Sequence, residues 1–330
     1  MEDVRFQAMV VRETDSKTFT RGIEERSVGD LPDGEVCIRV HFSSLNYKDA
    51  LSATGNRGVT RSFPHTPGID AAGVVESSSS PEFSPGDSVI VTSYDLGMNT
   101  SGGFGQYIRV PADWVVPLPR GLTPEESMVL GTAGFTAAMS VDRLVPDVAP
   151  SNGPVLVTGA TGGVGSLACA VLSRLGYEVA AVSGKPDDGF LSALGVTEVI
   201  PRTDFLENTD APMLKPKWAG VVDTVGGDIL TAAIKSTMES GIVTCCGLVA
   251  SPKLSMTVFP FILRGVALFG IDSQHCPMPL RRELWTHLAG DWKPQLPDAM
   301  TQKIGLGDLD PYIDRILKGQ IKGRTLVSLG

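Results

Sequence analysis

The spacing of apolar residues along the chain changes near residue 123. Before it, short runs of β-branched and aromatic residues are separated by Gly, Pro, Ser and Asp, which is typical of an irregular β-barrel. These runs cover residues 8–11, 36–42, 72–76, 88–92 and 107–110. After residue 123, apolar strands and amphipathic helices alternate, which predicts a doubly wound parallel α/β sheet. We expect its six strands at 154–158, 178–183, 197–200, 219–224, 241–246 and 266–271.

The second region begins with a helix predicted over residues 123–129. Thr123, Pro124 and Glu126 suit the N-cap, N1 and N3 positions of that helix. After Asp272 we expect helices at 279–291 and 309–318 and a last strand at 325–329.

A chain of 330 residues is long for one core, so two domains are expected. We predict a first domain over residues 1–124, completed by a returning tail at 273–330, and a second domain over 125–272.

Residues 153–176, GPVLVTGATGGVGSLACAVLSRLG, form an apolar strand, a glycine-dense turn and an amphipathic helix in succession. The glycines let the backbone turn tightly and approach a pyrophosphate, whose charge would face the N–H groups and positive dipole end of the helix. These glycines are Gly159, Gly162, Gly163 and Gly165. Their spacing departs from G-x-G-x-x-G, and a tight turn without a ligand is the alternative. Because strand, turn, helix and next strand fit within about 30 residues, the turn predicts a dinucleotide site.

The end of the second strand of this sheet indicates which dinucleotide binds. A site that prefers NAD usually has Asp or Glu there, to accept hydrogen bonds from the ribose 2′-OH. This chain has Ser183, Gly184 and Lys185, a set that favours a 2′-phosphate, so NADP(H) is predicted. Asp187 and Asp188 would reverse the preference if they folded back to the ribose, and a solvated turn is the alternative for Lys185.

Composition narrows the classes of function. A net charge of −9 argues against a nucleic-acid-binding surface. The cysteines lack the C-x-x-C spacing of zinc sites and are expected to be buried free thiols; they are Cys37, Cys169, Cys245, Cys246 and Cys276. Residues 1–11 show no signal-peptide pattern, and no apolar segment reaches the ~20 residues that span a bilayer. We therefore expect no membrane partner and a cytoplasmic location.

Several segments are more specific than the general pattern of strands and helices. They are SSLNYKDAL (43–51), PHTPGIDAAGVV (64–75), GGFGQYIRV (102–110), MVLGTAGFTAAMSV (128–141), TGATGGVGSLA (158–168), VVDTVGG (221–227), FILRGVALFGIDS (261–273) and KGRTLV (322–327). Together they resemble the YhdH/AcuI branch of the medium-chain dehydrogenase/reductase superfamily, which contains quinone oxidoreductase-like proteins and NADPH-dependent acryloyl-CoA reductases. The resemblance covers essentially the whole chain. It implies a GroES-like β-barrel catalytic domain and a six-stranded Rossmann domain that binds NADPH.

The chain departs from the zinc-containing members of that superfamily. Where those have a catalytic Cys, a Gly-His-Glu motif and a four-Cys lobe, this chain has Asn46 and Tyr47, then Pro-Gly-Ile-Asp at 67–70, and no cysteine cluster. We therefore expect no metal site. His41, in a strand-like run, and His65, before a Thr-Pro turn, are expected to be structural.

Without a metal, the chemistry best matched to a nicotinamide is reduction of an activated C=C bond, because the conjugated carbonyl spreads the developing negative charge. As the resemblance implies, Tyr47 lines the cleft beside the nicotinamide, where it orients the acceptor or passes a proton to the α-carbon. Asn46 would hold the carbonyl or the neighbouring ribose. Lys48 and Asp49 are further catalytic candidates. The alternatives are barrel packing for Tyr47 and solvated surface for Lys48 and Asp49.

The resemblance also implies cofactor contacts along the second region and the tail. Beyond Tyr47 and residues 183–185, they are Thr132, Thr136, Thr161, Gly162, Gly163, Val164, Arg202, Thr224, Val225, Gly247, Leu248, Ile271, Ser273 and Arg324. Threonines 132 and 136 would lie near the nicotinamide amide and phosphates, and the arginine at 202 would cap the adenosine end. The alternative for the two threonines is a plain helix start, and for the arginine it is a solvated loop. For residues 224, 225, 247 and 248 the alternative is a turn that ends a strand, and for residues 271, 273 and 324 it is domain packing.

We predict an NADPH-dependent reductase of activated alkenes, with hydride added at the β-carbon and a proton at the α-carbon. Short enoyl-CoA thioesters such as acryloyl-CoA are the leading substrates. NADPH:quinone oxidoreduction at the same site is one alternative, and a non-catalytic NADPH-binding sensor or structural protein is another. A homodimer is expected, because residues 266–271 would form an edge strand with open hydrogen bonds.

Overall fold

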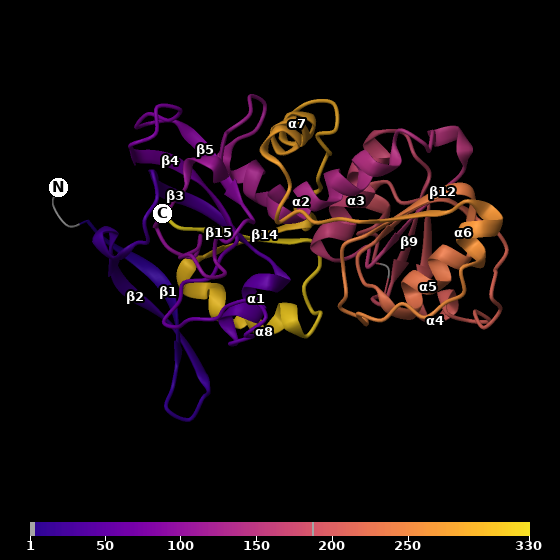
Figure 1. Cartoon of the computed structure of the whole chain (residues 1–330), viewed down its shortest axis with the longest axis horizontal. Helices are drawn as coiled ribbons and strands as arrows, with labels where there is room; N and C mark the ends of the chain where they lie inside the picture. The colour runs from indigo at the N-terminus through magenta and orange to yellow at the C-terminus, as the bar shows by residue number, and fades with distance from the viewer. Residues whose placement is uncertain (1–3, 187) are drawn as a thin grey trace. The chain divides into compact units, whose positions relative to one another are not determined.

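The computed structural model describes residues 4–186 and 188–330, and its contacts divide the chain into two compact units (Figure 1). Unit 1 contains the described residues up to Thr132, with Gln274–Ala289 and Thr301–Gly330. Unit 2 contains Ala133–Ser273 and Gly290–Met300. Asp187, weighed above against NADP(H), lies outside the described residues. The domain limits 1–124 and 125–272 remain a proposal.

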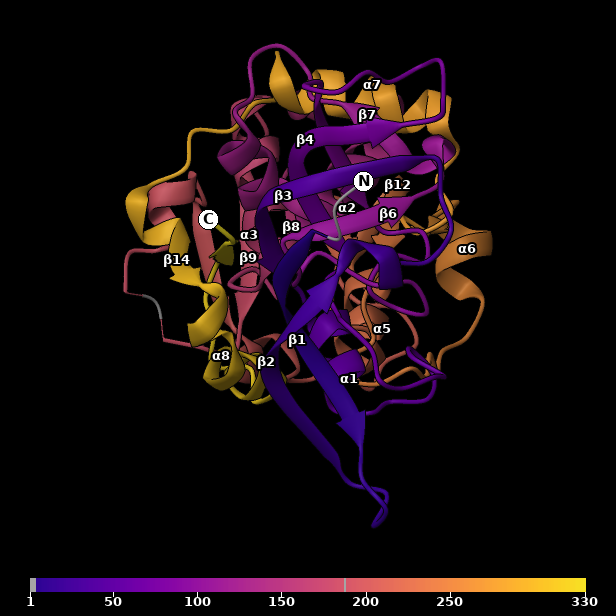
Figure 2. The same ribbon diagram turned by 90° about the vertical axis from the view of Figure 1, so that its left-hand side faces the viewer.

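Unit 1 is built on a seven-stranded sheet of order β14-β15-β3-β4-β5-β7, with β6 paired to β3. All paired strands in it are antiparallel except β14 and β15. The strands are β3 (Val36–Leu45), β4 (Asp70–Ser78), β5 (Ser88–Thr92), β6 (Tyr107–Val110), β7 (Val115–Pro117), β14 (Thr301–Gly305) and β15 (Arg324–Ser328). A hairpin of β1 (Arg5–Glu13) and β2 (Phe19–Ser27) forms a separate sheet, whose tip projects from unit 1 (Figure 2).

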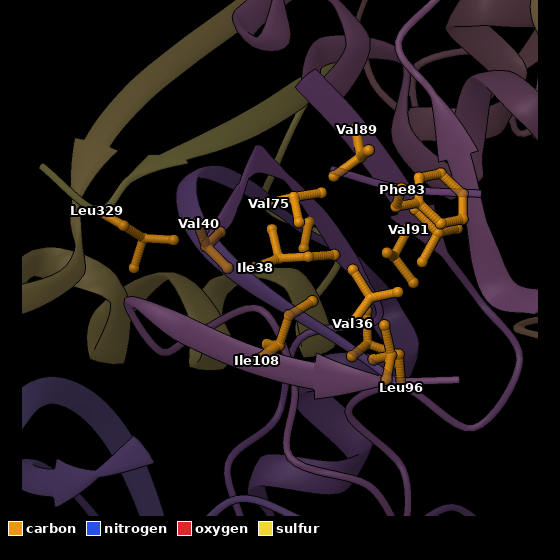
Figure 3. Packing of buried hydrophobic residues seen from close by; sticks show 13 residues of the cluster. Val36, Ile38, Val40, Val75, Phe83, Val89, Val91, Leu96, Ile108 and Leu329 are labelled. Atoms are coloured by element: carbon orange, nitrogen blue, oxygen red, sulfur yellow. The ribbon is translucent and has the colours of Figure 1, made fainter. Parts of the chain in front are cut away.

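The alternation of side chains along the strands creates the core of unit 1. Val36, Ile38 and Val40 lie on one side of β3 and are buried, because successive strand residues point to opposite faces. Figure 3 shows them packed with residues of neighbouring strands and with Leu329 at the end of the chain. The returning tail is therefore part of this hydrophobic core.

Unit 2 contains a parallel sheet of order β10-β9-β8-β11-β12-β13. Its strands are β8 (Val155–Thr158), β9 (Val179–Ser183), β10 (Glu198–Pro201), β11 (Trp218–Asp223), β12 (Thr237–Cys245) and β13 (Ala267–Gly270). The predicted six-stranded doubly wound fold is thus confirmed. Strand order reverses at β8, which lies between β9 and β11, and ligands of such sheets bind beyond the strand ends at this point.

The helices follow the predicted alternation. They are α1 (Tyr47–Ala53), α2 (Pro124–Leu144), α3 (Gly163–Arg174), α4 (Arg202–Phe205), α5 (Gly227–Lys235), α6 (Phe259–Arg264), α7 (Met278–Ala289) and α8 (Leu309–Leu317). At the start of α2, Thr123 and Glu126 form the expected capping box, with each side chain accepting the other's backbone N–H at 3.1 and 2.8 Å. Among the described residues, no helix combines the length and apolar character needed to cross a bilayer.

Some details differ from the sequence-based expectations. The strand expected at 241–246 begins earlier, at Thr237, because β12 pairs with β11 through a register shift. The five cysteines are free, but Cys245 and Cys246 are only partly buried, since they lie where β12 ends and the chain leaves the sheet. Strands β2 and β14 were not predicted, because their charged, polar sequences lack an apolar alternation.

Candidate active site

The first turn of α1 and the residue before it carry the four predicted catalytic residues, but their side chains have different surroundings. Tyr47 is 38% exposed. Lys48 is partly exposed, and its Nζ donates to Gln274 Oε1 at 2.8 Å. Asn46 and Asp49 are buried, with their polar atoms bonded inside unit 1. We therefore propose that Asn46 and Asp49 hold the local backbone and that Tyr47 is the proton donor; the catalytic roles expected for Asn46, Lys48 and Asp49 stay predictions.

Asp49 fixes the entry into α1. Its two carboxylate oxygens accept the backbone N–H groups of Asn46, at 2.7 Å, and Ile69, at 2.8 Å. Two causes raise the pKa of Asp49 from 3.8 to about 7: burial, which is the larger, and repulsion from the charge of Asp70. This carboxyl group thus ties the helix start to the segment that leads into β4.

Asp70, the first residue of β4, is the centre of a buried polar network. It is fully buried, and its carboxylate accepts hydrogen bonds from the hydroxyl of Ser44 at 2.6 Å and the side-chain amide of Asn46 at 2.8 Å. The backbone N–H and the hydroxyl of Thr132 donate to the same carboxylate. The Thr132 hydroxyl, which we expected near the cofactor, also lies 2.9 Å from the Ser93 hydroxyl. It is therefore engaged within unit 1.

Arg324, at the start of β15, completes this network. Its guanidinium donates to Ser44 Oγ at 2.8 Å, Asn46 Oδ1 at 3.1 Å and the Val129 carbonyl at 2.9 Å, and lies 3.8 Å from Asp70. Burial lowers the pKa of Arg324, and the Asp70 and Asp49 charges oppose that shift. The side chain is only 3% exposed, and its bonds in this structure lie within unit 1. Its expected contact with the cofactor stays a prediction.

The kink in α2 allows the network to form. Gly131 has φ +52° inside the helix, and a Cβ there would lie 2.5 Å from Asp70 Oδ2 and 2.6 Å from Ser44 Oγ. Only glycine leaves room for those polar atoms, and it tolerates this backbone conformation. The kink thereby presents the Thr132 N–H to the Asp70 carboxylate.

In unit 2, the glycine-rich turn leads from β8 into α3. Helix α3 begins at Gly163 with Gly162 as its N-cap, so two of the four glycines lie inside its first turn. A Cβ on Gly165 would lie 2.4 Å from the Gly159 carbonyl oxygen. Gly159 itself has φ +61°, and its Cβ position would be 2.4 Å from Thr224 Oγ1. This close packing places the helix start, with its unpaired N–H groups, at the carboxyl end of the sheet.

The predicted residues at the ends of β11 and β12 meet this turn. Thr224 donates its hydroxyl to the Thr158 carbonyl at 2.8 Å, and a Cβ on Gly247 would overlap the Thr224 carbonyl. The buried Asp223 organises them, because it accepts from the Thr158 hydroxyl and from the Gly226 N–H. Its pKa is raised by burial.

The predicted ribose-phosphate residues come together at the ends of β9 and β10. Parallel pairing places Ser183 opposite Pro201, so Gly184 and Arg202 leave neighbouring strands at the same level. A Cβ on Gly184 would lie 3.1 Å from the guanidinium carbon of Arg202. The Ser183 hydroxyl accepts the Lys185 N–H at 3.0 Å, which shapes the loop. An exposed guanidinium beside a glycine is a group that could bind a phosphate, so the predicted 2′-phosphate contact of these residues stays a prediction.

The remaining predicted cofactor residues lie at several places in unit 2. Thr136 donates its hydroxyl to Ser273 Oγ at 2.9 Å, so these two are brought together within unit 2. Ile271 continues β13 and donates its N–H to the Cys245 carbonyl. Leu248 is 64% exposed just after the end of β12. Thr161 and Val164 flank the two glycines at the start of α3, and Val225 follows Thr224. All of these remain proposed contacts.

Comparison with known proteins places this architecture in a family. The model for the alcohol dehydrogenase GroES-like domain matches residues 32–120, and the model described as zinc-binding dehydrogenase matches residues 163–288. The acrylyl-CoA reductase AcuI of Ruegeria pomeroyi is 43% identical over 327 residues, covering 98% of this chain and 99% of that protein. The "Putative quinone oxidoreductase YhfP" of Bacillus subtilis is 43% identical with the same coverage.

Solved structures of the same proteins or their relatives have the same fold as this chain. The crystal structure of the YhdH oxidoreductase of Salmonella enterica in complex with NADP has a TM-score of 0.93 and 41% identity, covering 98% of this chain and 100% of that chain. The structure of B. subtilis YhfP with NAD bound has a TM-score of 0.95 and 42% identity, covering 99% and 100%. The chain therefore belongs to the medium-chain dehydrogenase/reductase superfamily, in its quinone oxidoreductase-like family.

The name of the second model mentions zinc. In the part of the chain that the structure describes, no group of three or more His, Cys, Asp or Glu side chains could hold a metal ion. His65 is buried with its Nε2 2.8 Å from the Gly97 carbonyl oxygen, and burial lowers its pKa, which fits the structural role expected for it.

Proposed function

We propose that this protein is an NADPH-dependent reductase of activated C=C bonds, with a short enoyl-CoA such as acryloyl-CoA as the leading substrate. The observation that carries the proposal is the 43% identity to an acrylyl-CoA reductase over 98% of the chain. The identity extends over the Tyr47 segment of unit 1 and the glycine-rich turn of unit 2 alike, so it covers both proposed parts of the site.

The residues of unit 2 fit NADPH. The N–H groups at the start of α3 suit a pyrophosphate, and Arg202 beside the open Gly184 suits a 2′-phosphate. When bound, the reduced nicotinamide supplies the hydride that adds to the β-carbon of the substrate. A relative crystallised with NADP supports this choice, whereas the NAD-bound YhfP structure favours an assay of both coenzymes.

Unit 1 supplies the proton in this proposal. The Tyr47 hydroxyl would donate it to the α-carbon, where the conjugated carbonyl has accumulated negative charge. Tyr47 fits this role because it follows a buried N-cap and is itself exposed. Asn46 and Asp49 support the backbone at that position.

NADPH:quinone oxidoreduction is the second candidate. It is favoured by one observation, the equal identity to the protein named as a quinone oxidoreductase. The two candidates share the cofactor site and differ in the acceptor, an unsaturated thioester in one case and a conjugated cyclic dione in the other.

A direct assay separates them. Purified protein is incubated with NADPH and either acryloyl-CoA or a simple quinone, and oxidation of NADPH is followed by absorbance, with NADH in parallel. We expect efficient turnover of acryloyl-CoA with NADPH. Efficient turnover of quinones alone would reverse the ranking. Tight NADPH binding by calorimetry without turnover of either acceptor would instead indicate a sensor or structural protein.

We also propose a homodimer formed through unit 2. Strand β13 is at the edge of the sheet, as predicted, and apolar side chains are exposed on α6 and the segment before it. An open strand edge beside apolar surface suits pairing with a second copy. A reducing compartment such as the cytoplasm fits the five free thiols.

A further inference from the structure

We propose that Asp70 and Arg324 are positioning residues for Tyr47, acting through a buried charge pair that clamps the start of α1. This inference rests on the proposed function only for the role of Tyr47 as proton donor. The clamp itself is argued from contacts within unit 1.

Two side chains bridge the charged pair. The Ser44 hydroxyl donates to Asp70 at 2.6 Å and accepts from Arg324 at 2.8 Å. The Asn46 side chain does the same with its two ends, donating from Nδ2 to Asp70 at 2.8 Å and accepting at Oδ1 from Arg324 at 3.1 Å. The charges therefore dictate which way the Asn46 amide points.

This use of Asn46 is unusual for an N-cap residue. An N-cap asparagine ordinarily turns its side-chain oxygen to the backbone N–H groups of its own helix. Here the side chain is committed to Asp70 and Arg324, and the helix start is held by Asp49, which accepts the Asn46 N–H at 2.7 Å. Tyr47 is the next residue, so both the side chain and the backbone that precede it are fixed.

The clamp joins segments that are far apart in the sequence. Asn46 and Arg324 are 278 positions apart, and Arg324 also donates to the Val129 carbonyl in α2. The Thr132 N–H and hydroxyl close the other side of Asp70. Ser44, Asn46, Asp70 and Arg324 are each bonded to at least two others of these four. Displacement of one charge therefore displaces the tyrosine backbone.

Loss of the clamp should therefore lower the rate of catalysis more than the affinity for NADPH. An exposed phenol can protonate a carbon only if it is held at the right distance, and a displacement of about 1 Å can cost ~10²-fold in rate. Removing the clamp would leave Tyr47 present but misplaced. The cofactor residues of unit 2 lie outside the network.

The test uses Arg324→Lys, which keeps the charge but loses the planar fork that reaches Ser44 and Asn46 together. We expect kcat to fall about 10-fold or more, while the dissociation constant of NADPH changes less than about 2-fold. In the Tyr47→Phe background the same substitution should have little further effect on kcat, because the clamp acts through Tyr47. Additive losses would overturn the inference. Ser44→Ala, which keeps both charges and removes one bridge, is the second variant if Arg324→Lys fails to fold.

The matched control is Val89→Ala, which opens a cavity in the β-core of unit 1 (Figure 3), a cluster that contains none of the network residues. It should lower the unfolding temperature and leave kcat unchanged. A loss of kcat in this control equal to that of Arg324→Lys would show that general destabilisation explains both, and would overturn the inference.

A measurement independent of activity separates this inference from the proposed function. The five tyrosines are replaced by 3-fluorotyrosine, and the Tyr47 signal in the ¹⁹F spectrum is assigned by its loss in Tyr47→Phe. In Arg324→Lys the Tyr47 signal should shift or broaden, while that of Tyr177 in unit 2 stays fixed. An unchanged Tyr47 signal would overturn the clamp. A changed signal in a protein that reduces neither acceptor would support the clamp and refute the proposed reaction.

Discussion

At the scale of single residues, surroundings determine what each polar side chain can do. Asp49 and Tyr47 are two positions apart, yet one is fully buried and the other exposed. Burial gives the carboxyl group an unusual affinity for protons, while exposure gives the phenol access to a ligand. The proposed proton donor and the carboxyl group proposed to support it thus lie within one helical turn.

Asp49 should make stability depend on pH. Its pKa is about 7 in the folded protein and near the ordinary 3.8 in the unfolded chain, so the folded state holds the proton more tightly. The resulting stabilisation is complete below the unfolded pKa and is lost as the pH rises through about 7. The charges that face this carboxyl are Asp70 on β4 and Arg324 on β15.

We therefore expect the free energy of unfolding, measured by urea denaturation, to fall from about pH 4 to about pH 7, between the unfolded and folded pKa values of Asp49, more steeply in the wild type than in Asp49→Asn. The comparison removes the contribution of His65, whose lowered pKa acts in the opposite direction. Parallel pH profiles for the two proteins would contradict the assignment.

Tyr47→Phe tests the proton donor. Removing the hydroxyl should lower kcat with acryloyl-CoA by about 10²-fold, because general acid catalysis contributes on that order. The KM for NADPH should change little. Tyr312→Phe, on α8, is the control and should retain full activity. An undiminished rate in Tyr47→Phe would leave Tyr47 only a wall of the site.

Arg202→Ala tests cofactor selection. A charge-assisted bond to a 2′-phosphate is worth about 1.5–3 kcal/mol, so the KM for NADPH should rise at least about 10-fold while that for NADH stays nearly constant. Lys217→Ala is a suitable control, because Lys217 is a surface cation of unit 2 paired with Glu198. Equal changes for both coenzymes would argue that Arg202 does not contact the 2′-phosphate.

At the scale of elements, glycines decide how strands and helices meet. In unit 2 the turn before α3 is tight because Gly165 packs on the Gly159 carbonyl, and in unit 1 the kink of α2 exists because Gly131 leaves room for Asp70. Both glycines bring a backbone N–H group to a place where negative charge is held or expected.

Gly165→Ala should damage the turn. Its new Cβ would lie 2.4 Å from a backbone oxygen, so the turn must move. We expect NADPH binding, measured by calorimetry, to weaken by at least about 10-fold, since the N–H groups would no longer face the pyrophosphate together. Gly307→Ala, whose Cβ meets nothing within 4 Å, should bind normally. Normal affinity in Gly165→Ala would contradict this site for the pyrophosphate.

The sequence predicted these elements better than their side-chain partners. The six strands of unit 2 follow from apolar runs between glycines, and their parallel arrangement follows from the alternation with helices. The pairing of Arg202 with Gly184 was not predicted, because it depends on the register of β9 and β10. The Asp70–Arg324 network was missed for a related reason: hydrogen bonds across 278 positions leave no local pattern. The burial of Asn46 and Asp49 was not predicted either, because the sequence does not reveal which side of α1 is buried.

At the scale of the whole molecule, exposed apolar surface on unit 2 favours association. The described part of unit 2 exposes apolar side chains over a short stretch that leads into edge strand β13. They are Leu248, Val249, Leu254, Val258, Phe259, Ile262, Leu263 and Phe269. Exposure of so many large apolar side chains to water is unfavourable. A second copy of the chain would bury them and would pair with the open edge of the strand.

Ile262→Asp tests this association. Ile262 lies on α6 and is 68% exposed, so a carboxylate there costs little in the monomer. In an apolar interface it would be buried without a partner and would drive the copies apart. We expect light scattering at micromolar concentration to give a dimer for the wild type and a monomer for the variant. Ile23→Asp, 40% exposed on β2 of unit 1, is the matched control and should remain dimeric. A monomeric wild type would refute the interface, and a dimeric Ile262→Asp would move it away from α6.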